Sequence, residues 1–204
     1  MLFDDTYKTI AKPAEGVFRD KGSKFIAYAF PAGTEEEAKV FVANVRSAHP
    51  KARHHCWALR LGPDKTSFRI NDDGEPSGTA GRPILNTLLS AGLTNVIVIV
   101  VRYFGGTLLG VPGLINAYKT ATSEALKVAE VAEKTINDIY RFNFDYLQMN
   151  DVMRIIKEEN LHIRKQDYDN DCSVEVEIRK MQLNTVLERF SKVDGLRQRY
   201  LYTV

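Results

Sequence analysis

The feature that most constrains this chain is the apolar run VIVIVV at residues 96–101. Six residues suit a strand, and because no alternate position is polar, both faces of that strand are expected to be buried. A glycine-rich segment lies on each side of the run, at residues 71–83 and 102–113. The sequence therefore predicts a central strand with two glycine-rich loops close to it.

The period of the hydrophobic pattern places the other elements. In the first part of the chain we expect strands at 15–19, 24–30, 53–61 and 66–70, and helices from 35, over 83–89 and from 114 to about 132–135. The rest of the chain predicts strands at 136–144, 161–168, 172–179 and 196–203, with helices at 149–156 and 183–193. That second set follows the ferredoxin-like order βαββαβ. We expect an α+β protein with two domains, residues 1–133 and 134–204.

Composition excludes several classes of protein. The chain has 204 residues, of which 44% are hydrophobic and 26% charged, as in ordinary globular proteins. Its formal net charge of +2 does not suggest nonspecific duplex binding through counterion release. Two distant cysteines form no disulfide framework, and no apolar run approaches the roughly 20 residues of a membrane span. We expect a cytoplasmic protein with no secretory signal and no membrane association.

The second glycine-rich loop is a candidate anion site. The buried strand delivers Arg102 to its end, and Gly105 and Gly106 let the backbone approach a ligand just before a helix begins. Backbone N–H groups and the helix dipole at such a place bind anions, although the residues of the standard phosphate motifs are absent. The alternative is that the glycines serve tight turns and close packing, while Arg102 pairs with a carboxylate such as Asp72.

The first loop offers carboxylates, a hydroxyl group and a cation. Its candidate residues are Asp72, Asp73, Glu75, Thr79 and Arg82. Groups of this kind can hold a metal, act as acid and base, or bind a polar ligand. The alternative is an Asx turn and a capping network for the next helix, in which Thr79 or Gly81 leads the helix and Arg82 neutralises the aspartates.

His54, His55 and Cys56 form a secondary group of candidates. Neighbouring residues of a strand point to opposite faces, so only His54 and Cys56 can share a site. No second cluster at ligand spacing accompanies them, and we therefore expect neither a zinc site nor another cofactor. Cys56 has no activating neighbour beyond His54, which makes a Cys–His nucleophile a weak hypothesis.

Four blocks of the sequence resemble the IMPACT family, whose bacterial members are the YigZ-type proteins. In chain order they are KGSKFIAYA, ARHHCWALRLG, DDGEPSGTAGRPIL and VIVIVVRYFGGTLLGVPGLINAY, within about the first 130 residues. The resemblance implies a two-layer α/β first domain like the second domain of a small-subunit ribosomal protein, with a left-handed βαβ crossover. The remainder is similar to the last domain of elongation factor G.

Eukaryotic members of that family are linked to translational control, so the resemblance also implies a function. We expect a non-enzymatic binding protein that contacts RNA, the ribosome or a ribosome-bound translation factor. The alternative is an enzyme or small-ligand binder that acts on a phosphorylated or carboxylated anion at the two glycine-rich loops. Basic residues on the open face of the C-terminal sheet, interspersed with Glu175 and Glu177, favour a solvated face over nucleic-acid binding.

Overall fold

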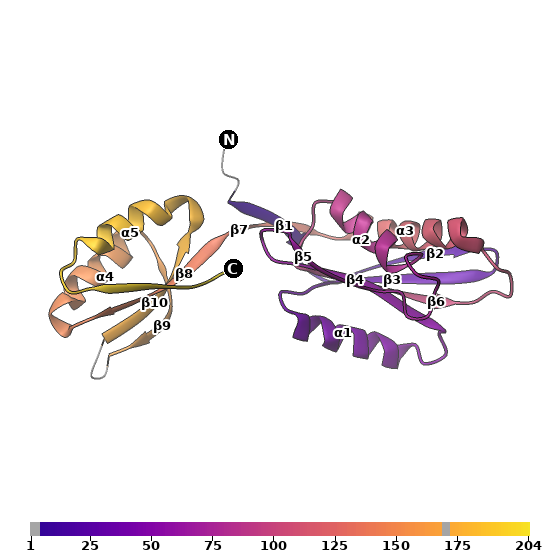
Figure 1. Ribbon diagram of the computed structural model, residues 1–204, viewed down its shortest axis with the longest axis horizontal. Coiled ribbons are helices and arrows are strands. Elements are labelled where there is room, and N and C mark those ends of the chain that lie inside the picture. Colours follow the sequence, from indigo (N-terminus) through magenta and orange to yellow (C-terminus); the bar gives the residue numbers. More distant parts are fainter. Residues whose placement is uncertain (1–4, 169–171) are drawn as a thin grey trace. The chain divides into compact units, whose positions relative to one another are not determined.

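The computed structural model describes residues 5–168 and 172–204, so residues 1–4 of the predicted first domain lie outside the described part. The chain forms two compact units (Figure 1). Residues 7–134 make up the N-terminal unit. Residues 135–204, together with Asp5 and Thr6, make up the C-terminal unit.

A five-stranded sheet forms the centre of the N-terminal unit. Its strands are β2 (Ala14–Asp20), β3 (Ser23–Pro31), β4 (His54–Leu61), β5 (Ser67–Asn71) and β6 (Val96–Tyr103). They lie in the order β2-β3-β6-β4-β5, and each neighbouring pair is antiparallel. The predicted strand is therefore central, and the six residues from Val96 to Val101 are all fully buried.

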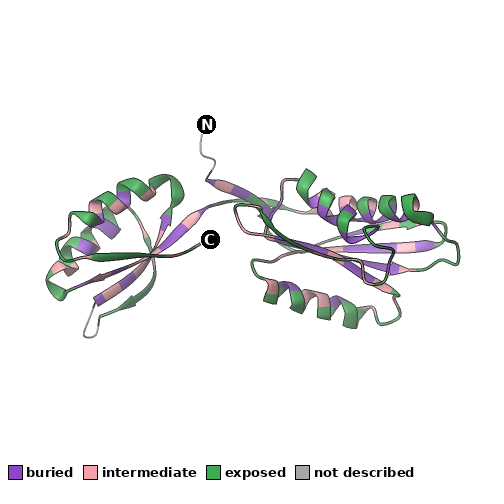
Figure 2. Cartoon of the chain, in the orientation of Figure 1, coloured by how far each residue is buried: buried purple, intermediate pink, exposed green. Residues whose placement is uncertain are grey.

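Helices cover both faces of this sheet. They are α1 (Glu35–Ala48), α2 (Gly81–Ser90) and α3 (Gly110–Val128). The β6 residues Val96, Val98 and Val100 pack with α2 and α3, whereas Ile97 and Ile99 belong to the cluster beneath α1. Figure 2 shows the buried stretches of the strands lying between the helices on the two sides. The α+β class is confirmed, but the expected two layers become three because α1 occupies the second face.

Two element boundaries differ from the sequence prediction. Helix α3 begins at Gly110 rather than near residue 114, because Pro112 is tolerated in the first turn of a helix. It ends at Val128, and the predicted end of that helix is instead a strand, β7 (Val131–Thr135), which pairs with β1 (Thr6–Ile10). Neither β1 nor β7 was predicted, since five-residue strands of mixed polarity carry little periodic signal.

The C-terminal unit has the ferredoxin-like arrangement. Its elements are β8 (Asn137–Phe144), α4 (Met149–Glu158), β9 (His162–Asp167), β10 (Cys172–Arg179), α5 (Leu183–Ser191) and β11 (Arg197–Thr203), with single 3-10 turns at Tyr146–Gln148 and Lys180–Gln182. The sheet order is β11-β8-β10-β9. Phe142 of β8 stacks on Phe190 of α5 with 3.9 Å between the ring centroids, in the core between sheet and helices.

Strand alternation places Arg141 and Glu175 on the sheet face opposite that core. They form an ion pair of 2.5 Å, and Arg164 pairs with Glu177 at 3.0 Å. The carboxylates thus neutralise part of the basic face. Within the described part of the chain, no helix is both long and apolar enough to cross a membrane.

Candidate functional site

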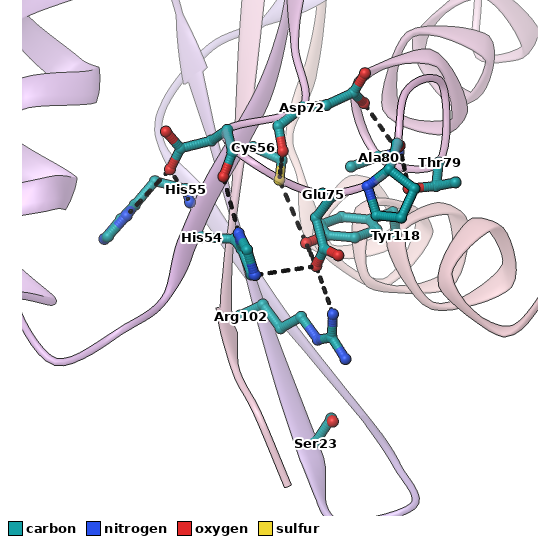
Figure 3. Close-up of polar contacts among 12 residues, drawn as sticks. Ser23, His54, His55, Cys56, Asp72, Glu75, Thr79, Ala80, Arg102 and Tyr118 are labelled. Atoms are coloured by element: carbon teal, nitrogen blue, oxygen red, sulfur yellow. Dashed lines mark hydrogen bonds and ion pairs between the residues drawn. The ribbon is translucent and has the colours of Figure 1, made fainter. Parts of the chain in front are cut away.

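The two glycine-rich loops meet at a buried ion pair within the N-terminal unit. Arg102, at the end of β6, donates from Nη1 to Glu75 Oε1 across 2.6 Å, and the two side chains are only 6% and 3% exposed. Tyr118 of α3 donates to the same carboxylate oxygen across 2.8 Å (Figure 3). Burial of a charge is costly unless the charge is paired and hydrogen-bonded, as it is here. Asp72, the partner suggested from the sequence, is therefore the wrong carboxylate.

The guanidinium of Arg102 is only partly satisfied. Its central carbon lies 5.5 Å from the ring centroids of both Phe25 and Phe104, within cation–π range. With Nη1 engaged by Glu75, the buried Nε has no hydrogen-bond partner in the described residues. The edge of the guanidinium formed by Nε and Nη2 is the one that pairs side-on with carboxylates.

Asp72 caps helix α2 from outside the helix. Its carboxylate accepts N–H bonds from Gly78 at 2.8 Å, Ala80 at 3.1 Å and Gly81 at 2.8 Å. The N-cap residue, Ala80, has no polar side chain of its own, so Asp72 supplies the acceptor and the negative charge that a helix N-terminus favours. Thr79 does not lead the helix, because its hydroxyl donates to the Pro76 carbonyl oxygen.

Asp73 links the first loop to β4 and α1. Its carboxylate accepts from the His55 backbone N–H at 2.7 Å and from Arg46 at 3.0 Å. Burial opposes ionisation, but these hydrogen bonds hold the pKa of Asp73 below its usual value. Burial also lowers the pKa of His55, whose ring lies on the α1 side of the sheet.

His54 lies on the opposite side of β4 and approaches the ion pair. Its Nδ1 is 2.8 Å from the Asp73 carbonyl oxygen, which can only accept, so Nδ1 carries a proton. The other ring nitrogen, Nε2, then faces Glu75 Oε1 at 3.9 Å. Of the two secondary candidates, His54 therefore contacts the Arg102–Glu75 centre directly.

Cys56 is a core residue next to this centre. Its thiol donates to the Asp72 carbonyl oxygen at 3.0 Å and lies 3.3 Å from the Tyr118 hydroxyl oxygen. The side chain is fully buried, and burial raises the pKa of Cys56 far above the ordinary value of a thiol. Because the thiolate is the nucleophilic form, this environment does not suit nucleophilic catalysis at neutral pH.

A cavity of about 470 Å³ opens beside the ion pair, and both glycine-rich loops line it. The first loop contributes Gly74, Glu75 and Pro76, and β4 with the residue before it contributes His54 and Arg53. The second loop and the start of α3 contribute Arg102, Phe104, Leu108, Leu109, Gly110, Val111 and Leu114. The two loops thus share one cavity, with a charged base and a largely apolar wall.

Other candidates lie away from the cavity. Arg82 is exposed on α2, where its guanidinium carbon lies 5.8 Å from the Phe68 ring centroid. Gly105 serves close packing, since a Cβ there would lie 1.9 Å from the Gly22 carbonyl carbon. Gly106 has a φ of +89°, which favours glycine. Across residues 5–168 and 172–204, no three His, Cys, Asp or Glu side chains are grouped to hold a metal ion.

Sequence reasoning missed the apolar wall and Tyr118. Leu108, Leu109 and Val111 carried a usable signal, because three branched residues inside a glycine-rich loop have no strand or helix pattern to bury them. Tyr118 gave only a weak signal, as one polar aromatic residue on the small-residue face of a helix.

The chain is thus an α+β protein of two compact units, with a cavity between the two glycine-rich loops of its N-terminal unit. Residues 21–126 match the family model of the Impact N-terminal domain, which is more than half of the chain. The chain is 37% identical over 160 residues to "IMPACT family member YigZ" of Escherichia coli (strain K12), and the match covers 78% of each. The protein belongs to the IMPACT family.

Two further relatives extend this comparison. A solved crystal structure of "an hypothetical protein" superposes with a TM-score of 0.78 at 31% identity, covering 97% of this chain and 98% of the other. "Protein IMPACT homolog" of Saccharomyces cerevisiae (strain ATCC 204508 / S288c) is 33% identical over 94 residues, which is 45% of this chain and 36% of the yeast protein. The similarity to the solved structure thus covers nearly the whole chain, whereas the similarity to the yeast protein covers less than half of it.

Proposed function

We propose that this protein is a non-enzymatic binding protein that acts in translation or its regulation, and that the N-terminal unit makes the contact. The observation that carries the proposal is a cluster of exposed apolar side chains on the second loop and the start of α3: Phe104, Leu108, Val111 and Ile115. Leu108 is 82% exposed and Val111 is 51% exposed. Phe104, Leu108 and Val111 line one cavity, and Ile115 follows Val111 one turn later on α3. Exposed apolar surface of this kind marks interaction sites. We call these four residues the apolar loop surface.

Support for the link with translation comes from family membership. The chain belongs to the IMPACT family, which also includes "Protein IMPACT homolog" of yeast. Membership of this family implies the link to translational control stated above for its eukaryotic members. The partner would be the ribosome, its RNA or a ribosome-bound factor. The apolar character of the loop surface favours a protein component over RNA, because RNA contacts rely mainly on cations and on aromatic stacking.

Catalysis has less physical support at this site. Cys56 is buried and its pKa is raised, Asp72 is engaged as a helix cap, and Glu75 is held by Arg102 and Tyr118. Cys56, Asp72 and Glu75 therefore each have a structural partner. These contacts support a binding function better than a catalytic one.

Co-sedimentation of the full chain with ribosomes tests the proposal. We expect wild-type protein to pellet with ribosomes, and Leu108→Ser to weaken binding about tenfold or more, because burial of a leucine contributes roughly 1.5–3 kcal/mol. The matched control is Val40→Ser, which replaces a side chain 58% exposed on α1, the helix on the other face of the sheet. Val40→Ser should leave binding unchanged.

Two results would contradict the proposal. The first is wild-type protein that stays entirely in the supernatant at low salt. The second is an equal loss of binding in both variants, which would show that the apolar loop surface has no special role. Raising the salt concentration distinguishes the type of partner, since contacts with RNA phosphates weaken steeply with salt and apolar contacts do not.

A further inference from the structure

The cavity beside the apolar loop surface combines a cationic base with an apolar wall. We propose that it binds the carboxylate end of a polypeptide whose last side chain is aliphatic. The polypeptide would be part of the translation partner, so the proposal rests on the function proposed above and specifies which part of that partner is recognised.

Arg102 provides the first argument, because it is a buried cation with a free pairing edge. Its side chain is 6% exposed and lines the cavity, and Glu75 occupies only Nη1. Nε itself is fully covered, so a ligand would pair with Nη2, the other nitrogen of that edge, for which the described residues supply no hydrogen-bond partner. A carboxylate is the group that best matches a guanidinium nitrogen at the base of an apolar cavity.

The N-terminus of α3 provides the second argument. Gly110 and Val111, its first two residues, line the same cavity. No side chain in the described part of the chain caps this helix, and its first turn contains no acidic residue, in contrast to α2 with Asp72. The free backbone N–H groups and the positive end of the helix dipole therefore favour an anion from a ligand.

The charged residues that line the cavity favour a ligand with a negative charge. Among the described residues that line the cavity, Glu75 is the only carboxylate, and Arg102 neutralises it. Arg53, exposed at the rim, has no ion-pair partner in the described part of the chain. The remaining positive charge disfavours the ammonium group of a free amino acid. The last residue of a peptide has a free α-carboxylate, and its α-amino group is acylated, so it carries the anion without the ammonium group.

The apolar residues that line the cavity favour an aliphatic side chain next to the carboxylate of the ligand. Leu108, Leu109, Val111 and Leu114 offer branched aliphatic surface, and Phe104 adds a phenyl ring. Apolar walls with a few convergent polar groups are typical of small-ligand sites. A nucleotide fits less well, because its base would lie on aliphatic side chains with few groups to hydrogen-bond.

NMR titration of the full-length ¹⁵N-labelled protein tests the proposal with four probes: N-acetyl-leucine, N-acetyl-leucine amide, free leucine and uridine monophosphate. We expect N-acetyl-leucine to shift the Gly110 and Val111 amide signals and the Arg102 Nε–H signal, with a dissociation constant of about 1 mM for so small a fragment. The amide, which lacks the charge, and free leucine, which adds an ammonium group, should each bind at least about tenfold more weakly.

Two variants keep the test independent of the buried ion pair, whose removal can unfold the unit. Arg53→Gln and Leu108→Ser should each weaken N-acetyl-leucine binding severalfold, while Val40→Ser should not. The absence of saturable shifts at Gly110 and Val111 would overturn the proposal. Equal binding of the amide, tighter binding of free leucine, or tighter binding of uridine monophosphate would also overturn it. Wild-type protein that pellets with ribosomes yet fails this titration would leave the translation proposal standing.

Discussion

The buried pair of Arg102 and Glu75 makes a quantitative prediction about stability. Replacement of either residue alone, by Arg102→Met or Glu75→Leu, leaves one uncompensated charge in a place where the side chains are 6% and 3% exposed. Loss of one partner of a buried ion pair costs about 3–5 kcal/mol. Each single variant should therefore be strongly destabilised.

The double variant should be much more stable than the sum of its single changes. Apolar residues of similar volume can replace a buried ion pair at little cost. The principal loss is the acceptor of the Tyr118 hydroxyl, which is worth about 1–3 kcal/mol. The singles sum to at least about 6 kcal/mol, so we expect a coupling free energy of at least about 3 kcal/mol between positions 75 and 102.

Urea unfolding followed by the fluorescence of Trp57 measures this coupling. Trp57 is the only tryptophan of the chain and lies in β4, so its signal reports on the N-terminal unit. The exposed pair of Arg69 and Glu35, at 3.1 Å, is the control, and its coupling should not exceed about 1 kcal/mol. Additivity within about 0.5 kcal/mol at positions 75 and 102 would refute the reasoning.

Three further predictions concern single residues. Gly105→Ala should destabilise the N-terminal unit by several kcal/mol, because its Cβ would overlap the Gly22–Ser23 backbone. Gly106→Ala has open space around its Cβ and only an unfavourable φ, so it should cost about 1 kcal/mol. The urea unfolding midpoints of the two variants test this difference. Asp72→Ala removes the acceptor of three N–H groups and should lower stability by about 2 kcal/mol and speed hydrogen exchange at the Ala80 and Gly81 amides. Burial lowers the pKa of His55 in the folded protein, so the neutral ring contributes fully to the free energy of unfolding above about pH 6.5. That contribution is lost as the pH falls towards the lower folded-state pKa. The urea midpoint should drop over this range, and His55→Gln should reduce that drop.

The elements set by local periodicity could be predicted from the sequence. The central position of β6 followed from six apolar residues in a row, and the ferredoxin-like order followed from the alternation of strand and helix patterns. The two faces of β4 were also correct, because Cys56 and Leu59 belong to clusters on opposite sides of the sheet. These predictions depend only on the local pattern of apolar side chains and on the geometry of strands and helices.

The details of the site depend on long-range contacts that periodicity does not encode. Glu75 and Arg102 are 27 residues apart, and the choice of Glu75 over Asp72 as the partner is decided by loop geometry, because Asp72 is occupied by the N-terminus of α2. The early start of α3 was missed because glycines and Pro112 indicate a loop, although proline fits the first turn. The shared cavity likewise arises only when both loops are folded.

Site-specific photocrosslinking tests the central claim most directly. Leu108 is replaced by a photoreactive phenylalanine analogue, and Val40 by the same analogue as a control, in cells of the source organism. The proposed function predicts that mass spectrometry of the Leu108 products identifies a ribosomal component or a ribosome-bound factor that the Val40 products lack. Identical products at both positions, or Leu108 products without any component of the translation machinery, would contradict it.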